Sequence, residues 1–430
     1  MRARDRARQA GTAKLGADFH KLWTASAISN LGDGVGSVAG PLLVASLTAD
    51  PALVAGAAFA GQVPWLLFSL LSGVYVDRVD RQRLIVVVNL LRGAVMSGLA
   101  LSIAFDAVTI PLVYAAFFLL GTGETLADTA SQARLPAVVP DELLPRANAR
   151  LGATFTVVNQ FAAKPLGAWL FVAGAALAFG VNALTFVASA LIVAAMRPVP
   201  RPAAEPKSEP EPEPEPKRSA VRHDIAEGVR ALWAHGLLRT LALCLGAMNI
   251  VFCAAFAIFV LYARDRLGLS ELGYGTLLTT FAVGGLIGSS VAGRLAARYG
   301  AAALLRAGLI VECVTHLTLA LTTSPWTAGA ILIVFGVHTM VWNVVVNTVR
   351  QRAVPDRLQG RVVGVYSLMD LGGAALGSLL GGLFARTLGL TAPFWIAFGC
   401  MVAVTAAAWR PFRAATTVTR PAPRTPPPAC

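Results

Sequence analysis

The sequence predicts an all-α membrane protein in which twelve transmembrane helices form two six-helix bundles. Three observations lead to this prediction. The 430-residue chain is 56% hydrophobic and only 14% charged, whereas about a quarter of the residues of a soluble domain are charged. The apolar residues are gathered into runs of about 20 residues, which is the length that crosses the hydrocarbon of a bilayer. Finally, two loop motifs recur about half a chain later.

Six apolar runs lie in each half of the chain. Those of the first half are 21–47, 53–75, 84–105, 110–130, 151–171 and 174–196. Those of the second half are 238–262, 273–296, 302–322, 327–348, 362–384 and 391–409. The expected organisation is therefore an N-terminal tail (1–20), a first bundle (21–196), a linker (197–237), a second bundle (238–409) and a C-terminal tail (410–430).

Two pairs of similar loops indicate that one six-helix unit is duplicated. The first pair is SGVYVDRVDRQR (72–83) and VAGRLAARYG (291–300), and the second is VVPDELLPRAN (138–148) and AVPDRLQGRV (353–362). Two independent matches at nearly the same offset are hard to obtain by chance. Repeated bundles of this kind are typical of transporters, in which the halves rock around a central site in alternating access.

The distribution of Lys and Arg predicts the orientation of the chain. Of 36 such residues, three fall in the odd-numbered loops (Arg264, Arg266 and Arg386), and Arg92 and Lys164 fall inside helices. The other 31 lie in the termini and the even-numbered loops, which places both termini in the cytoplasm and the protein in the cytoplasmic (inner) membrane. The net charge of +13 is thus a topology signal, and no soluble basic domain is present to bind nucleic acid.

The longest segment outside the predicted spans is the linker. Its EPKSEPEPEPEP run (205–216) predicts an extended polyproline spacer that buries no core. The residues that follow, 221–236, place an apolar stripe on one helical face, which favours an amphipathic helix on the cytoplasmic leaflet. The tail PAPRTPPPAC (421–430) has the composition of a disordered segment.

Small residues recur at four-residue spacing in two of the runs. They are Gly373, Gly377 and Gly381 in the eleventh and Gly284, Gly288 and Ala292 in the eighth. Such stripes let helix backbones approach closely. They fit either a sliding contact between the bundles or ordinary packing within one bundle, and the sequence does not separate the two.

The loop between the second and third runs, Gly73-x-x-x-Asp77-Arg78-x-x-Arg81-x-Arg83, resembles that of the major facilitator superfamily. The segments LWTASAISNLGDGVG (22–36) and LPAVVPDELLPRANAR (135–150) are similar to the branch of macrolide-efflux and enterobactin-exporter transporters. The resemblance covers nearly the whole chain apart from the linker and tails. It implies the major facilitator fold and transport by alternating access.

One departure concerns the fifth run. Drug antiporters of this superfamily usually carry a Gly-Pro pair here, whereas this chain has NQFAAKPLGAW (159–169), with Lys164 in place of the glycine. Pro165 and Gly167 remain. The substitution indicates a site with its own charge requirement.

The resemblance implies that the loop acts as a conformational latch, formed by Gly73, Asp77, Arg78, Arg81 and Asp128. Gly73 allows close helix approach, and Asp77 can accept hydrogen bonds from backbone N–H groups at a helix start. Arg81 can pair with Asp128 at the cytoplasmic end of the fourth helix. The alternative is that the basic loop only sets topology, but topology requires neither Asp77 nor Gly73.

Ionisable residues inside the membrane are costly, so each is a candidate for proton coupling or substrate binding. Those in this chain are Asp33, Glu124, Lys164 and Asp370. An isolated buried charge tends to be neutralised, whereas a pair can stay charged. We therefore expect Lys164 to pair with Asp33 or Glu124. Either the carboxylate of this pair exchanges its lysine partner for a proton, or the pair is static and only fixes helix packing.

Other polar residues in the predicted spans give weaker signals. His338 and Asn343, with Asn347, fit a polar stripe facing the cavity, although a lone His in an apolar helix is more often a packing residue. Glu312 and His316 have the spacing of a metal pair, but two ligands do not make a metal site, so a local hydrogen-bonded pair is favoured. Arg92 is expected to be peripheral and to satisfy a neighbouring carbonyl or carboxylate.

These features predict a secondary transporter that exports an amphipathic small molecule (a drug, macrolide or siderophore-like compound) in exchange for protons. Proton-coupled uptake, lysolipid flipping, a non-transporting sensor and a membrane enzyme are the alternatives. The chain has no Walker A loop, nucleophile–base pair or metal constellation. We therefore expect no catalysis, no cofactor and no metal. The expected partners are a small-molecule substrate, protons and the lipid bilayer, with the chain acting as a monomer.

Overall fold

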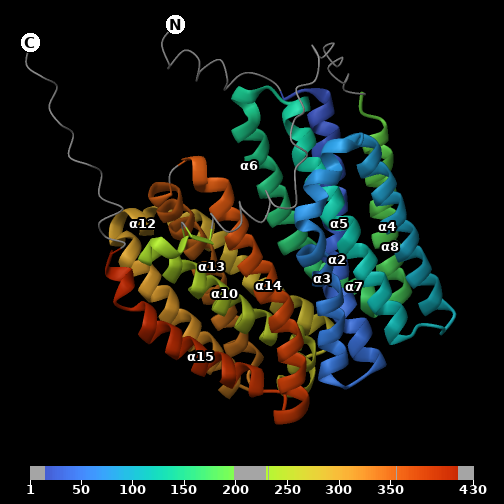
Figure 1. Ribbon diagram of the computed structural model, residues 1–430. Helices are drawn as coiled ribbons and strands as arrows, with labels where there is room; N and C mark the ends of the chain where they lie inside the picture. Colours follow the sequence, from blue (N-terminus) through green and yellow to red (C-terminus); the bar gives the residue numbers. More distant parts are fainter. Residues whose placement is uncertain (1–14, 198–228, 231, 355, 415–430) are drawn as a thin grey trace, which may run out of the picture.

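The computed structural model describes residues 15–197, 229–230, 232–354 and 356–414, which form helices and turns and contain no β-strand. The helices gather into two groups that stand side by side (Figure 1). One group, blue to green, comes from the first half of the chain, and the other, yellow to red, comes from the second half (Figure 1).

The first half forms α2 (Ala17–Leu47), α3 (Pro51–Arg78), α4 (Arg81–Ala104), α5 (Ile110–Val138), η1 (Asp141–Leu143), α6 (Leu144–Thr154), η2 (Phe155–Ala162), α7 (Ala163–Ala173) and α8 (Ala175–Ala194). The second half forms α10 (Gly236–Ala257), α11 (Phe259–Leu261), η3 (Tyr262–Arg266), α12 (Glu271–Leu321), α13 (Pro325–Ala353), α14 (Asp356–Leu388), α15 (Ala392–Ala408) and η4 (Pro411–Ala414).

These helices provide the twelve predicted membrane crossings. In the described residues, eight helices are long and apolar enough to span a bilayer. One of them, α12, makes two crossings because it bends at Gly300, which adopts φ 75°. The other three crossings are α2, the broken helix α6–η2–α7 and the shorter α15.

Several helices begin at polar residues that satisfy their free N–H groups. Asp50 accepts a hydrogen bond from the Ala52 amide at the start of α3, and Ser270 and Ser324 cap α12 and α13 in the same way. In the latch loop the cap of α4 is Asp80, which accepts from the Arg83 amide at 2.9 Å. Asp80 is thus the cap of α4, and the role expected for Asp77 stays a prediction because its side chain lies outside the described residues.

The fifth crossing is not a regular α-helix. Its middle segment, η2, has π-helical hydrogen bonding and ends three residues before Pro165, which has no N–H to donate. Gly34 and Gly167 bring α2 close to this crossing, since a Cβ at Gly167 would lie 2.8 Å from the Val35 carbonyl oxygen. The irregular segment thus lies against α2, the helix that carries Asp33.

Both glycine stripes pack within the second half. A Cβ at Gly377 or Gly381 would collide with the backbone of α10, and one at Gly284 or Gly288 would collide with α13. Ordinary packing is therefore the role of these stripes, and the sliding interpretation is wrong. The two halves meet instead where α14 packs on α3 and α12 packs on α7. Gly382 lies against Ala52 and Ala55 there.

Part of the predicted amphipathic helix lies within the described residues. Leu232 is fully buried in the hydrophobic core of the second half, whereas the neighbouring Trp233 is 43% exposed. At Leu232 the apolar stripe thus packs on the protein itself rather than on a membrane surface. Residues 221–228 and the Glu-Pro run lie outside the described residues.

Candidate functional site

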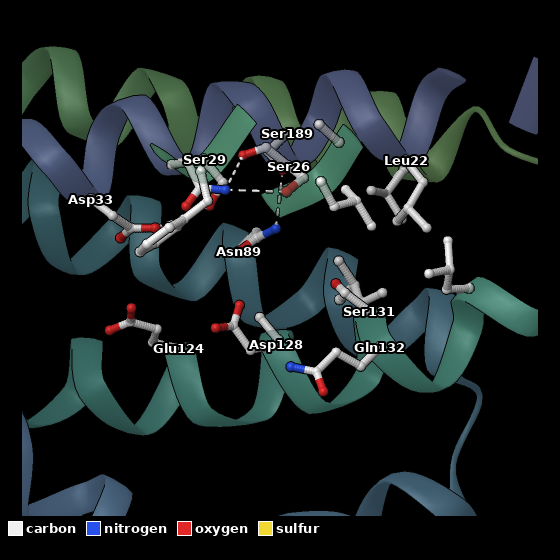
Figure 2. A pocket seen from close by; sticks show the side chains of 18 of the residues that line it. Leu22, Ser26, Ser29, Asp33, Asn89, Glu124, Asp128, Ser131, Gln132 and Ser189 are labelled. Carbon is white, nitrogen blue, oxygen red and sulfur yellow. Dashed lines mark hydrogen bonds between the residues drawn. The ribbon is translucent and has the colours of Figure 1, made fainter. Parts of the chain in front are cut away.

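A cavity of about 560 Å³ lies within the first half, between α2, α4, α5, the α6–η2 segment and α8. Its wall includes the carboxylates of Asp33, Glu124 and Asp128 and the guanidinium of Arg92. Figure 2 shows Glu124 and Asp128 projecting from α5 toward the space that Asp33 faces from α2. Three acidic groups and one basic group thus share a single intramembrane cavity.

Asp33 is paired with Arg92 of α4. The distance from Arg92 Nη2 to Asp33 Oδ1 is 2.6 Å, and the Arg92 side chain is only 3% exposed. Ser29, one turn earlier on α2, donates to the other carboxylate oxygen of Asp33 at 3.4 Å. The predicted pairing of Lys164 with Asp33 is therefore wrong, and Arg92 is not peripheral.

The sequence around Arg92 provides room for its long side chain. A Cβ at Gly123 of α5 would lie 2.7 Å from Arg92 Cγ, so a larger residue there would displace the arginine. The guanidinium carbon lies 4.0 Å from the centre of the Phe186 ring on α8, a geometry that stabilises a cation. Arg92 is thus held from three sides, by α2, α5 and α8.

Glu124 and Asp128 occupy successive turns of α5 and face the cavity. Asp128 is exposed to the cavity, whereas Glu124 is partly buried. Both carboxylates are close enough to Asp33 and Arg92 to interact with them electrostatically. The single guanidinium cannot neutralise all three acids, so the cavity carries excess negative charge whenever all three are ionised.

Amide and hydroxyl groups fix the polar wall around these charges. Asn30 donates to the Ser26 carbonyl oxygen at 2.8 Å, and Asn159 of η2 donates to the Asn30 carbonyl oxygen at 3.1 Å. On the opposite side, Asn89 donates to Ser189 (Figure 2). The π-helical segment is therefore joined to the helix of Asp33 through its backbone.

A second cavity, of about 430 Å³, continues on the other side of the ion pair. Both cavities are lined by Asp33, Arg92 and Glu124, so these residues lie between them. The second cavity also reaches Phe256 of α10 in the other half. A ligand that moved from one cavity to the other would pass the charged residues.

Two contacts lie at the end of the molecule where α2 joins α3. The Arg386 Nε of α14 lies 3.5 Å from an Asp50 carboxylate oxygen, and Arg264 donates to the Ala45 carbonyl oxygen at 2.9 Å. Both contacts join the two halves. The larger cavity instead extends toward the starts of α2 and α6, where Leu22 and Leu144 line it.

The other candidate residues lie elsewhere. In the described part of the chain Lys164 makes no ion pair, and its Nζ lies 6.0 Å from the centre of the Phe281 ring on α12. Asp370 of α14 accepts a hydrogen bond from Asn249 of α10. Asn343 donates to the carbonyl oxygen of Thr339 on its own helix at 3.0 Å.

His338 of α13 is buried against Glu312 of α12 and not in the cavity wall, with His338 Nε2 3.2 Å from Glu312 Oε1. The Glu312–His316 pair expected from the sequence therefore has a third member on a neighbouring helix. No group of three or more His, Cys, Asp or Glu side chains in the described ranges is arranged to hold a metal ion.

The predicted latch is only partly visible. The surroundings of Gly73 and the side chains of Asp77 and Arg78 lie outside what the structure describes. The Arg81 guanidinium donates to the carbonyl oxygen of Ala133 on α5 at 2.9 Å. Asp128, on the same helix, lies in the cavity wall, and its pairing with Arg81 stays a prediction.

The comparisons with known proteins agree with this architecture. The chain is 28% identical over 390 residues to the multidrug efflux pump Tap of Mycolicibacterium fortuitum, covering 86% of this chain and 90% of that protein. It is 26% identical over 403 residues to the enterobactin exporter EntS of Escherichia coli O1:K1 / APEC, covering 89% of each.

Solved structures are similar at the level of the fold. A bacterial homologue of the iron transporter ferroportin, in the inward-facing state, superposes with a TM-score of 0.72 at 16% identity, covering 95% of this chain and all of that one. A bacterial homologue of the lysosomal transporter Spinster gives 0.68 at 16% identity, covering 93% and 96%. The family model described as transmembrane secretion effector matches residues 13–425. The chain therefore belongs to the transmembrane secretion effector family of major facilitator superfamily transporters.

Proposed function

We propose that this transporter exports an amphipathic small molecule (a drug, macrolide or siderophore-like compound) across the cytoplasmic membrane in exchange for protons. The observation that carries the proposal is the cavity in which Asp33, Glu124 and Asp128 face a single guanidinium, that of Arg92. The names of the relatives, a multidrug efflux pump and an enterobactin exporter, support export as the direction.

The charge balance of the cavity gives the coupling mechanism. Carboxylates in a low-dielectric site stay ionised only beside a positive charge, and otherwise bind protons. Arg92 is already held by Asp33 at 2.6 Å. Glu124 and Asp128 therefore alternate between a proton and a ligand group that donates hydrogen bonds or carries positive charge. A ligand that binds displaces protons, and protons that return displace the ligand.

The mixed wall of the cavities supports an amphipathic ligand. Polar groups such as Ser29, Asn89 and Gln132 line the larger, 560 Å³ cavity together with Leu22 and Ile85. The smaller, 430 Å³ cavity is lined by aromatic rings and by two glutamine amides. A molecule with an apolar body and several polar groups fits both walls, because every buried polar group then finds a hydrogen-bond partner.

Alternating access gives the direction of movement. The distribution of Lys and Arg puts both termini in the cytoplasm, so the open end of the larger cavity faces inward and the Asp50–Arg386 contact closes the outer end. Rocking of the two bundles, residues 21–196 and 238–409, opens the outer end and closes the inner one. The latch loop stabilises one of the two states, and the chain acts as a monomer.

The proposal is tested in inverted membrane vesicles, in which the cytoplasmic face is outside. A panel of macrolides, other antibiotics and siderophores is offered at a fixed concentration, with an imposed pH gradient or with the gradient collapsed by an ionophore. We expect gradient-dependent uptake of at least one compound and none in vesicles with Glu124→Gln at equal abundance. Accumulation that is the same with and without the gradient would contradict proton coupling, and accumulation only in right-side-out vesicles would contradict export.

A further inference from the structure

A buried polar cluster in the second half has no part in the cavity. Glu312 lies in the portion of α12 that follows Gly300, and its two carboxylate oxygens face two imidazoles. Oε1 is 3.2 Å from His338 Nε2, and Oε2 is 3.5 Å from His316 Nε2. The three residues are 3%, 7% and 2% exposed, respectively. They are thus sealed from solvent in a segment that crosses the membrane.

The surroundings of the cluster are almost entirely apolar. Among the described residues, only the two imidazoles act electrostatically on the Glu312 carboxylate. The residues of α10 and α15 that line the small hollow beside His316 are apolar, and Phe252 and Phe394 are among them. The nearest other titratable side chain on α12, Cys313, lies within hydrogen-bonding distance of Thr405 of α15, at 3.5 Å.

The fold makes specific room for this cluster. Gly308, one turn before Glu312, lies directly under the His338 ring, and a Cβ there would be 2.6 Å from His338 Cε1. The ring of Trp342 flanks the same imidazole at 5.8 Å. Both ring nitrogens of His316 and Oε2 of Glu312 are buried and have no hydrogen-bond partner in the described structure, so the 3.5 Å contact between them is electrostatic only. Such an orphaned nitrogen is costly in a purely structural cluster, because it has lost its water without gaining a partner.

Charge balance limits what the cluster can bind. With both imidazoles neutral and the carboxylate ionised, the site holds one uncompensated negative charge in a low-dielectric interior, which is strongly unfavourable. One added proton makes the cluster neutral, whether it resides on the carboxylate or on an imidazole. A second proton would again leave a net charge. The cluster therefore favours one bound proton.

We propose that Glu312, His316 and His338 form a second proton-binding site of this transporter, separate from the carboxylates of the cavity. The proton bridges α12 and α13, so its release weakens the attraction between these helices and its return restores it. The site thus couples protonation to movement within the second half. This proposal rests on the proton-coupled exchange proposed above, to which it adds one proton per cycle.

The first test is the proton-to-substrate stoichiometry, measured as the membrane potential and pH gradient at which net flux reverses in proteoliposomes. The substrate is a compound that the vesicle panel identifies. We expect Glu312→Gln, which preserves shape and removes the charge, to lower the ratio by one proton while exchange stays proton-coupled. An unchanged ratio in Glu312→Gln overturns this proposal alone. A wild-type protein with no proton coupling overturns the proposed function as well.

The second test requires no transport measurement. Variants are used only to assign each NMR signal to its histidine. Imidazole ¹⁵N signals of the purified wild-type protein are recorded between about pH 5 and pH 9, the range in which histidines change charge. We expect the signals of His316 and His338 to change together, at the same pH. His20 serves as the solvent-accessible comparison. Independent responses, no response across this range, or tightly retained metal that a chelator removes would each overturn the proposal.

Discussion

The two halves of this molecule share one architecture but place their charged residues differently. In the first half, Asp33, Glu124 and Asp128 face a cavity that is open at one end. In the second half, Glu312 and His338 are buried within the helix bundle, and Phe256 and Ala257 are the described residues that reach the smaller, 430 Å³ cavity. The two halves therefore share their helix packing, which needs only apolar and small residues, and not the charged site.

This difference assigns distinct tasks to the halves. In the proposed mechanism, the first half holds the cavity groups that exchange ligand and proton, and the Glu312 cluster of the second half binds one further proton. The second half contributes Phe256 and Ala257 to the smaller cavity and contacts the first half through Gly382 against Ala55 and Arg386 beside Asp50. Changes in the first half should therefore alter coupling, whereas most changes in the second half should alter stability or opening.

The largest effect is expected from Arg92→Met. The substitution leaves Asp33 without its partner at 2.6 Å, and breaking such a pair costs about 3 kcal/mol or more of folding free energy. Transport should be lost. The double variant Arg92→Met with Asp33→Asn removes both charges and should recover most of the thermal stability but no transport. Wild-type stability and transport in the single variant would show that the ion pair is incidental.

A smaller effect is expected from Gly123→Val, which changes no charged residue. The added side chain meets Arg92 Cγ, and overpacking of this kind costs about 1–3 kcal/mol. The guanidinium should move away from Asp33, and initial transport rates should fall about tenfold, which corresponds to about 1.4 kcal/mol. The matched control is Gly98→Val on α4, where a Cβ would have no heavy atom within 4 Å. Equal rates in the two variants would contradict the positioning role of Gly123.

Lys164→Ala tests whether the boundary between the halves takes part in coupling. Its described contact is the Phe281 ring at 6.0 Å, and such a cation–π interaction is worth about 0.5–1 kcal/mol at exposed sites and about 2 kcal/mol when desolvated. We expect a modest loss of stability and an unchanged proton-to-substrate ratio. Loss of proton coupling in this variant would restore Lys164 to the role that the sequence suggested.

The smallest effect is expected from deleting the Glu-Pro repeats (205–216), which lie outside the described residues. A spacer transmits no specific contact, so transport at equal membrane abundance should stay within about twofold, roughly 0.4 kcal/mol. A replacement of the same length by Gly and Ser controls for chain length. If the deletion abolished transport while the replacement did not, transport would require a linker of sufficient length, which would contradict this prediction.

The helices could be predicted from the sequence because each crossing requires about 20 apolar residues. The run 110–130 thus gave the position of α5, although the helix continues to Val138 beyond the apolar part. The run 151–171 became three segments, since π-helical hydrogen bonding depends on Pro165 and on packing against α2. The hydrophobic periodicity of the sequence reveals neither the effect of Pro165 nor the packing against α2.

The site could be predicted only in part, for a related reason. Asp33 and Glu124 stood out because charges in an apolar run are costly, and both face the cavity. Arg92 was equally visible but was assigned to the periphery, because the rotation of α4 about its axis cannot be obtained from one sequence. The pairing of His338 with Glu312 was missed for the same reason. The i, i+4 spacing revealed only the contact within a single helix.

The most direct test of the central claim is proton release on ligand binding. A transported compound is added to the purified protein in weakly buffered detergent solution, and the pH change is recorded for the wild type, Glu124→Gln and Asp128→Asn. We predict that the wild type releases protons in proportion to ligand bound, and that each variant still folds but releases fewer. If the variants bind ligand with the same proton release as the wild type, the carboxylates of this cavity are not the site of exchange.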